Sequence, residues 1–342
     1  MPRSARAVRL LDQRPAASSS AGHAKLHRTA HTLNDDLKRS LAFQSRGRQW
    51  RHHVTVAAPS RDVLALPTIA AKMIFDAALG NFGANADPRA MAETARAADD
   101  LGFRALWTAD HLLPPSSQPQ FARVFEPLTC LAYVASITQR VRLGSSVIVL
   151  PMRNPFVVAK QAATLDALSG GRLILGIGVG WSAEEYANVG ADFRTRGKRM
   201  EETIALFRHL WSGRREPFTG QFYGYSDGVF DPLPTQGKDL PLMIGGRSDV
   251  VLRRVARHAA IWQTTSSGPD VFPSLVEKIR AEPGGERVEV GAVYAYKDSL
   301  EDARTAIRTW EAAGAQHLSI NFGPPDGRVE RMRTFARAFG MS

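Results

Sequence analysis

From Met73 to the C-terminus, the chain alternates short apolar runs with segments whose apolar residues recur every three or four positions. The short runs have the length of buried strands, and the longer segments have the period of helices that bury one face. The strand-like runs begin at or near residues 74, 103, 141, 173, 241, 261, 288 and 317. This alternation predicts βα units around a parallel sheet.

The number of units favours a closed barrel over an open sheet. Eight strand–helix units in about 270 residues match the usual size of a (β/α)8 barrel, about 250 residues. Residues 213–240 are rich in Gly, Pro and aromatic residues and interrupt the alternation, so we expect an excursion over the surface or the site mouth, with a short hairpin. We therefore predict an α/β protein, a (β/α)8 TIM barrel over residues 73–342 with a surface excursion near 213–240.

Residues 1–72 differ from the rest of the chain. They contain 13 Lys or Arg residues against 4 Asp or Glu residues and show no sustained period, so we expect a disordered, basic N-terminal extension. A transit peptide, a flexible basic tail and an upstream extension of a domain that starts at Met73 all fit this composition. The third is favoured, because Met73 directly precedes the first convincing strand.

Charge and cysteine content exclude several classes of protein. Most of the net charge of +11 comes from residues 1–72, and residues 73–342 carry 31 basic against 29 acidic residues, which does not support a nucleic-acid-binding stripe. No apolar run approaches the roughly 20 residues of a membrane helix. The single cysteine, Cys130, excludes an intramolecular disulfide and fits a cytoplasmic location. We expect no nucleic-acid or membrane partner.

Candidate site residues follow the predicted strands. In such barrels the chemistry lies at the carboxyl-terminal ends of the strands, so these residues should meet at one rim. Glycines there allow a bound anion to approach backbone N–H groups. After the run that begins at residue 241, Ser248 is placed to cap the helix that follows. The candidates are Asp110, His111, Ser146, Val147, Gly178, Gly180, Trp181, Gly245 and Gly246.

Five motifs together resemble the bacterial luciferase-like superfamily, and more narrowly its branch that uses coenzyme F420, a 5-deazaflavin. The resemblance extends over residues 73–342. It implies a (β/α)8 barrel with the deazaflavin or flavin across the carboxyl-terminal rim, and a homodimer. The motifs are WTADH (107–111), LGSSVIVLP (143–151), RLILGIGVGWSAEEY (172–186), GKRMEETIALFRHLWSG (197–213) and PLMIGG (241–246).

The resemblance also implies residue roles. Asp110 and His111 match the family's Asp-His pair beside the ring, where an imidazole can transfer a proton. Ser146-Val147 matches a non-proline cis peptide that supports the deazaflavin. The glycines at 178, 180, 245 and 246 match backbone positions near the phosphate and ribityl tail.

One position departs from the pattern. Trp181 stands where sugar-phosphate dehydrogenases of this family have a proton-donating Glu, which argues against sugar-phosphate oxidation and favours an apolar substrate. Glu184 and Glu185 follow and offer a substitute for that acid, but we favour the interpretation that they are favourable acids in the first turn of a helix.

The predicted function is an F420-dependent oxidoreductase that transfers a hydride between the deazaflavin C5 and a small, fairly apolar organic substrate. We expect the substrate to lie between Trp181, His111 and the loop of residues 213–240, with His111 moving the proton. An FMN-dependent monooxygenase that uses O₂ is the first alternative, and a non-catalytic flavin- or deazaflavin-binding protein is the second. A metal-dependent hydrolase is disfavoured, because Asp110-His111 is the only pair of candidate ligands at a strand end.

Overall fold

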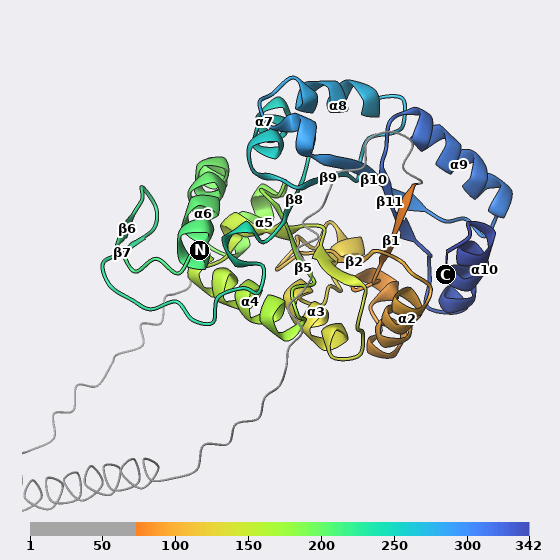
Figure 1. The fold of residues 1–342 in the computed structure, drawn as a ribbon, viewed down its shortest axis with the longest axis horizontal. Coiled ribbons are helices and arrows are strands. Elements are labelled where there is room, and N and C mark those ends of the chain that lie inside the picture. The colour runs from red at the N-terminus through yellow and green to blue at the C-terminus, as the bar shows by residue number, and fades with distance from the viewer. Residues whose placement is uncertain (1–72, 342) are drawn as a thin grey trace, which may run out of the picture. The chain divides into compact units, whose positions relative to one another are not determined.

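The computed structural model describes residues 73–341, which form a (β/α)8 barrel (Figure 1). The strands of the barrel are β1 (Ile74–Ala78), β2 (Ala105–Thr108), β3 (Arg142–Ser145), β4 (Ile148–Val149), β5 (Leu173–Gly178), β8 (Leu242–Gly245), β9 (Ile261–Thr264), β10 (Glu289–Ala295) and β11 (His317–Asn321). The expectations for residues 1–72 lie outside the described residues.

All neighbouring strands of the barrel pair in parallel, and the sheet closes because β3 pairs with both β2 and β5. The run at 141–150, expected as one strand, is divided into β3 and β4. Ser146 and Val147 lie between them, joined by a cis peptide bond, and β4 pairs with β5 alone. Since β3 and β4 share one position, nine strands fill eight positions and the predicted eightfold barrel is confirmed.

The helices surround the strands (Figure 1). Their starts follow ordinary capping rules: α2, α3 and α4 each begin with proline, preceded by Asp87, Glu126 or Asn154, whose side chain accepts a first-turn amide hydrogen. The helices are α2 (Pro88–Asp100), α3 (Pro127–Ala135), α4 (Pro155–Leu168), α5 (Ala183–Asn188), α6 (Arg196–Trp211), α7 (Asp249–His258), α8 (Phe272–Arg280), α9 (Leu300–Ala312) and α10 (Arg328–Ala338).

Apolar side chains form two cores. The larger fills the space between strands and helices, and the smaller lies inside the barrel around Trp107, Ile174 and Met243. Gly144 makes room for the indole, because a Cβ atom there would lie 2.3 Å from Trp107 Cε3. Cys130 is buried in α3.

The barrel interior also contains charged and polar side chains, which we call the interior polar chain. Barrels of this kind usually fill these layers with branched apolar residues. Here Arg104 binds Asp76 through two hydrogen bonds of 2.9 and 2.6 Å and also donates to Glu289, and the Asp76 and His317 side chains are fully buried. The members of the interior polar chain are Asp76, Arg104, Glu289, His317, Gln263 and Ser146.

The excursion at 213–240 contains the expected short hairpin, formed by β6 (Phe218–Thr219) and β7 (Gly224–Tyr225). It lies outside α6 (Figure 1), where the Glu202 carboxylate accepts amide hydrogens of residues 221–223. Phe156 of α4 contacts Tyr225, and Lys160 donates to the Asp231 carbonyl. Of the two positions expected for this excursion, the surface and the site mouth, the surface is therefore correct.

We expect Gly144→Ala to destabilise the protein, because the added methyl group has no space beside Trp107. Overpacking of this kind costs about 1–3 kcal/mol. Gly228→Ala is the matched control, since a Cβ atom there would meet nothing closer than 4.0 Å. Urea unfolding measures both variants, and equal midpoints would contradict the packing described here.

The pKa of Glu289 predicts how the stability of the protein changes at acidic pH. Burial raises this pKa, but contacts with His317 and Arg104 outweigh burial and lower it to about 2 from 4.5. The ionised carboxylate therefore stabilises the fold above pH 4.5, and this contribution is lost as the pH falls towards 2.

We expect Glu289→Gln to lower stability at neutral pH by about 3 kcal/mol, as for loss of one partner of a buried pair. Its melting temperature should then vary less than that of the unaltered protein between pH 4.5 and 2. Glu301→Gln, on the exposed surface of α9, is the control. If the melting temperature of Glu289→Gln changed with pH in parallel with that of the unaltered protein, the stabilising role of ionised Glu289 would be contradicted.

Candidate active site at the carboxyl-terminal rim

His111 follows β2 and is held by a carboxylate from a distant part of the chain. Its Nδ1 lies 2.9 Å from Glu185 Oε2, and the other oxygen of Glu185 accepts the amide hydrogens of Leu112 at 2.6 Å and Leu113 at 3.2 Å. The Glu185 side chain is 2% exposed. Because a carboxylate only accepts, the proton of the neutral imidazole is on Nδ1. Among residues 73–341, His111 Nε2 has no hydrogen-bond partner.

The role of Glu185 was missed in the sequence. We interpreted Glu184 and Glu185 alike, as acids of a helix's first turn, and both do lie in the first turn of α5. Ser182 caps this helix by accepting the Glu185 amide hydrogen. The orientation of α5 then exposes Glu184 and buries Glu185 against the loop after β2. Adjacent acids carry no sequence signal that separates them.

Asp110 is buried and holds a different part of the rim. It accepts hydrogen bonds from the Val149 amide at 2.8 Å and from Arg153 Nη2 at 2.5 Å. Burial raises the pKa of Asp110, with Arg153 and the Val149 amide acting in the opposite direction. Among residues 73–341, the hydrogen-bond partners of the Asp110 side chain do not include His111. Asp110 thus connects the loop after β2 to β4 and orients the segment that carries His111.

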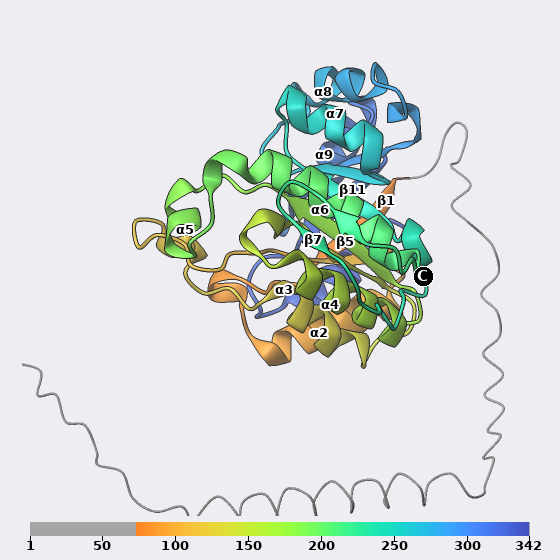
Figure 2. The same cartoon turned by 90° about the vertical axis from the view of Figure 1, so that its left-hand side faces the viewer.

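Three rings form an aromatic cluster at the rim. The His111 ring lies 4.4 Å from that of Phe121 and 6.2 Å from that of Trp181, between centroids, and the Phe121 and Trp181 rings are 5.9 Å apart. Trp181 is 56% exposed. Figure 2 shows α5 and the loop after β2 together at one end of the barrel. Phe121 was missed because its loop has no period that predicts its position.

The peptide bond between Ser146 and Val147 is cis, as the family resemblance implied. The Val147 side chain lies beside two of the candidate glycines: a Cβ atom on Gly178 would lie 2.5 Å from it, and one on Gly245 would lie 3.2 Å away. Packing against Val147 therefore accounts for both glycines. Gly180 has a φ of +67°, a conformation that favours glycine.

Groups suited to an anion lie after β8 and β9. Gly246 has a φ of +118° and leads into α7, where the Ser248 side chain caps no amide, which corrects our expectation. The first-turn N–H groups of α7 are thus free of a side-chain cap, and such groups bind phosphate well. Arg247 contacts the Ser266 carbonyl at 3.5 Å, and Ser267 Oγ is buried without a partner in the described chain. These groups fit a phosphate-bearing ligand.

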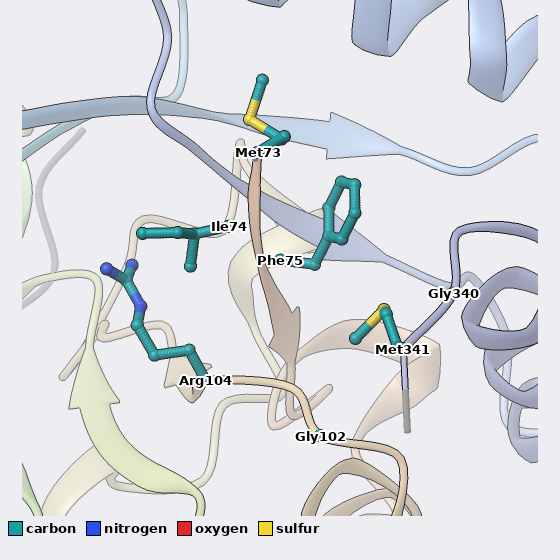
Figure 3. Close-up of a pocket in the computed structure, with 7 residues that line it drawn as sticks. All are labelled: Met73, Ile74, Phe75, Gly102, Arg104, Gly340 and Met341. Carbon is teal, nitrogen blue, oxygen red and sulfur yellow. The ribbon is translucent and has the colours of Figure 1, made fainter. Parts of the chain in front are cut away.

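A cavity of about 290 Å³ lies elsewhere, at the amino-terminal ends of β1 and β2 (Figure 3). Ile74 and Arg104 are among its lining residues, so it is at the opposite end of the strands from His111. Within residues 73–341, no three His, Cys, Asp or Glu side chains are grouped to hold a metal ion. No helix in this range is long and apolar enough to cross a membrane.

The structure thus brings His111 and Trp181 together with Glu185 and Phe121, and places the predicted glycines and Ser146-Val147 at the ends of neighbouring strands. It does not bring the excursion at 213–240 to this cluster, since its described contacts are with α4, α6 and, through Gln236, with the amino-terminal ends of β3 and β5. The loop that covers His111 is instead the one containing Phe121.

The chain is similar to proteins of known and unknown function. An uncharacterised protein of Mycobacterium tuberculosis is 34% identical over 200 residues, covering 54% of this chain and 68% of its own. The F420-dependent glucose-6-phosphate dehydrogenase of Amycolatopsis mediterranei is 34% identical over 190 residues, covering 54% and 55%.

Among solved structures, an F420-dependent secondary alcohol dehydrogenase in complex with an F420-acetone adduct aligns with a TM-score of 0.67. It is 16% identical and covers 79% of this chain and 99% of its own, a likeness that shows the fold. The family model described as luciferase-like monooxygenase matches residues 72–338. Because this match covers more than half of the chain, the chain belongs to the luciferase-like monooxygenase family of enzymes.

Proposed function

We propose that the protein binds coenzyme F420 and exchanges a hydride between the cofactor and a small, apolar organic substrate. The observation that carries the proposal is His111, anchored through Nδ1 to buried Glu185 with Nε2 unpartnered within the described residues. The names of the F420-dependent relatives support the choice of cofactor.

The rim fits the parts of such a cofactor. Ser146 and Val147 would contact the ring, and the glycines at 178, 180, 245 and 246 would let the ligand approach the backbone. The uncapped N-terminus of α7, with Arg247, would hold the phosphate-bearing tail. When bound, the deazaflavin supplies a carbon, C5, that accepts or donates the hydride.

His111 would supply the accompanying proton transfer. Oxidation of an alcohol removes a hydride from carbon and a proton from the hydroxyl group, and reduction of the carbonyl compound returns both. His111 Nε2 can take or give that proton, while Glu185 fixes the tautomer and the direction of the ring. Asp110 would act through the backbone, by holding the loop that carries His111.

Trp181 and Phe121 would form the substrate wall beside His111. By the family resemblance, Trp181 stands where sugar-phosphate dehydrogenases have an acid, so this rim would offer an apolar indole where a sugar phosphate needs a proton donor. We infer that alcohols or ketones with apolar substituents are better substrates than sugar phosphates.

The cofactor assignment predicts selective binding. Adding the full-length protein to F420 should quench the cofactor's fluorescence with a dissociation constant in the micromolar range, about −8 kcal/mol. FMN should bind much more weakly. Tight FMN binding without F420 binding would instead support the FMN-dependent monooxygenase, and binding of F420 without turnover of any alcohol or ketone would support a binding protein.

The assigned proton transfer predicts the effect of His111→Ala. The variant should lower kcat/KM for F420-dependent turnover by roughly 10²–10⁴-fold, the usual contribution of acid–base catalysis. Its affinity for F420 should remain within about tenfold. Glu185→Gln should also slow turnover, because an amide no longer fixes the imidazole tautomer. The control is His209→Ala, since His209 lies on α6 and binds the Glu216 carbonyl.

Stopped-flow absorbance of F420 with a panel of aliphatic alcohols and ketones measures these rates. Unchanged turnover in His111→Ala would remove His111 from the mechanism, and an equal loss in His209→Ala would indicate a general effect on folding.

A further inference from the structure

The interior polar chain runs from Arg104, which lines the cavity at the amino-terminal end (Figure 3), to Ser146 at the rim. Glu289 Oε1 lies 2.8 Å from His317 Nδ1, and His317 Nε2 lies 3.2 Å from Gln263 Oε1. Gln263 Nε2 donates to Ser146 Oγ at 2.9 Å. The charged end is thus connected to the cis peptide by consecutive polar contacts.

His317 is the member whose protonation decides the direction of these contacts. Both ring nitrogens lie near oxygen atoms: Nε2 is hydrogen-bonded to Gln263 Oε1, and Nδ1 lies at ion-pair distance from Glu289 Oε1 but outside hydrogen-bond geometry. A ring nitrogen faces an oxygen acceptor favourably only when it carries a hydrogen. The side chain is fully buried, and Gly291 leaves the space for its ring, so water does not replace either partner.

The charges around His317 also favour a ring with hydrogen on both nitrogens, the imidazolium. Arg104 supplies one positive charge against the two carboxylates of Asp76 and Glu289, so an imidazolium at His317 makes the buried group neutral. Burying an unbalanced charge is costly. A further cation, Arg142 of β3, interacts with Asp166 as well as with Asp76 and Glu289.

We propose that the interior polar chain fixes the direction of hydrogen bonding at Ser146. An imidazolium at His317 requires the carbonyl oxygen of Gln263, which turns the Gln263 amide hydrogens towards Ser146 Oγ. Ser146 then accepts from Gln263, and its own hydroxyl hydrogen is left for an acceptor atom at the rim. Ser146 is half-buried, and Gln263 is the hydrogen-bond partner of its side chain among the described residues.

Gln263 and His317 are therefore positioning residues, which act on a bound ligand through Ser146. A ligand with a carbonyl oxygen or an unprotonated ring nitrogen at this point would be favoured over one with an N–H group. That the ligand is F420 rests on the proposed function, whereas the state of His317 does not.

Nitrogen NMR of the ligand-free, full-length protein tests the first step. The two imidazole nitrogens of His317, assigned by their disappearance in His317→Gln, should both show bound hydrogens at neutral pH. A neutral ring with hydrogen on Nδ1 alone would overturn the proposal, because Gln263 would then present its amide to His317 and its carbonyl to Ser146.

Fluorescence titration with F420 tests the second step. Gln263→Leu, His317→Leu and Ser146→Ala should each weaken binding by about fivefold, the worth of one hydrogen bond. His317→Gln should retain affinity within about twofold, because its amide can still donate to the Gln263 carbonyl. The double variant Ser146→Ala/His317→Leu should bind no more weakly than either single variant.

The control is Thr94→Val, which removes two buried hydrogen bonds of the Thr94 hydroxyl, to the Ala90 carbonyl and from Arg328, away from the barrel interior. Additive losses in the double variant, or an equal loss in Thr94→Val, would overturn the proposal. If the unaltered protein does not bind F420, the proposed function fails, and the NMR result alone decides the direction of hydrogen bonding.

Discussion

The buried carboxylate of Glu185 is the interaction on which the candidate site depends. It holds the His111 ring and two backbone amides of the same loop, so one side chain fixes both the proposed catalytic group and the segment that carries it. A carboxylate left unpaired at this depth would be costly, and its three partners make the position stable. The barrel supplies the rest, because its closure brings the ends of β2 and β5 to the same rim.

Much of the fold could be predicted because it depends on local periodicity. Prolines at 88, 127 and 155 mark helix starts, and the apolar runs between the helices give the eight positions of the barrel. The break between β3 and β4 was not visible in the run at 141–150, because every residue there is compatible with a strand. The uncapped start of α7 was missed for a related reason: a serine in the right place need not turn its hydroxyl towards the helix.

The candidate site was predicted only in part, because its partners are distant in sequence. His111 and Trp181 follow strand ends, which local reasoning finds, but Glu185 lies 74 residues from His111 and Phe121 lies in a loop without a period. The interior polar chain was also unforeseen. Its members occupy strand positions where apolar residues are usual, and only the closed barrel shows that Asp76, Glu289 and His317 share one interior.

A structure of the full-length protein with F420 bound tests the central claim most directly. We expect the deazaflavin ring against Ser146 and Val147, with C5 on the side of His111 and the phosphate at the start of α7. A ring bound elsewhere, for example in the cavity at the amino-terminal ends of β1 and β2, or a ring at the rim with His111 turned away from it, would contradict the account.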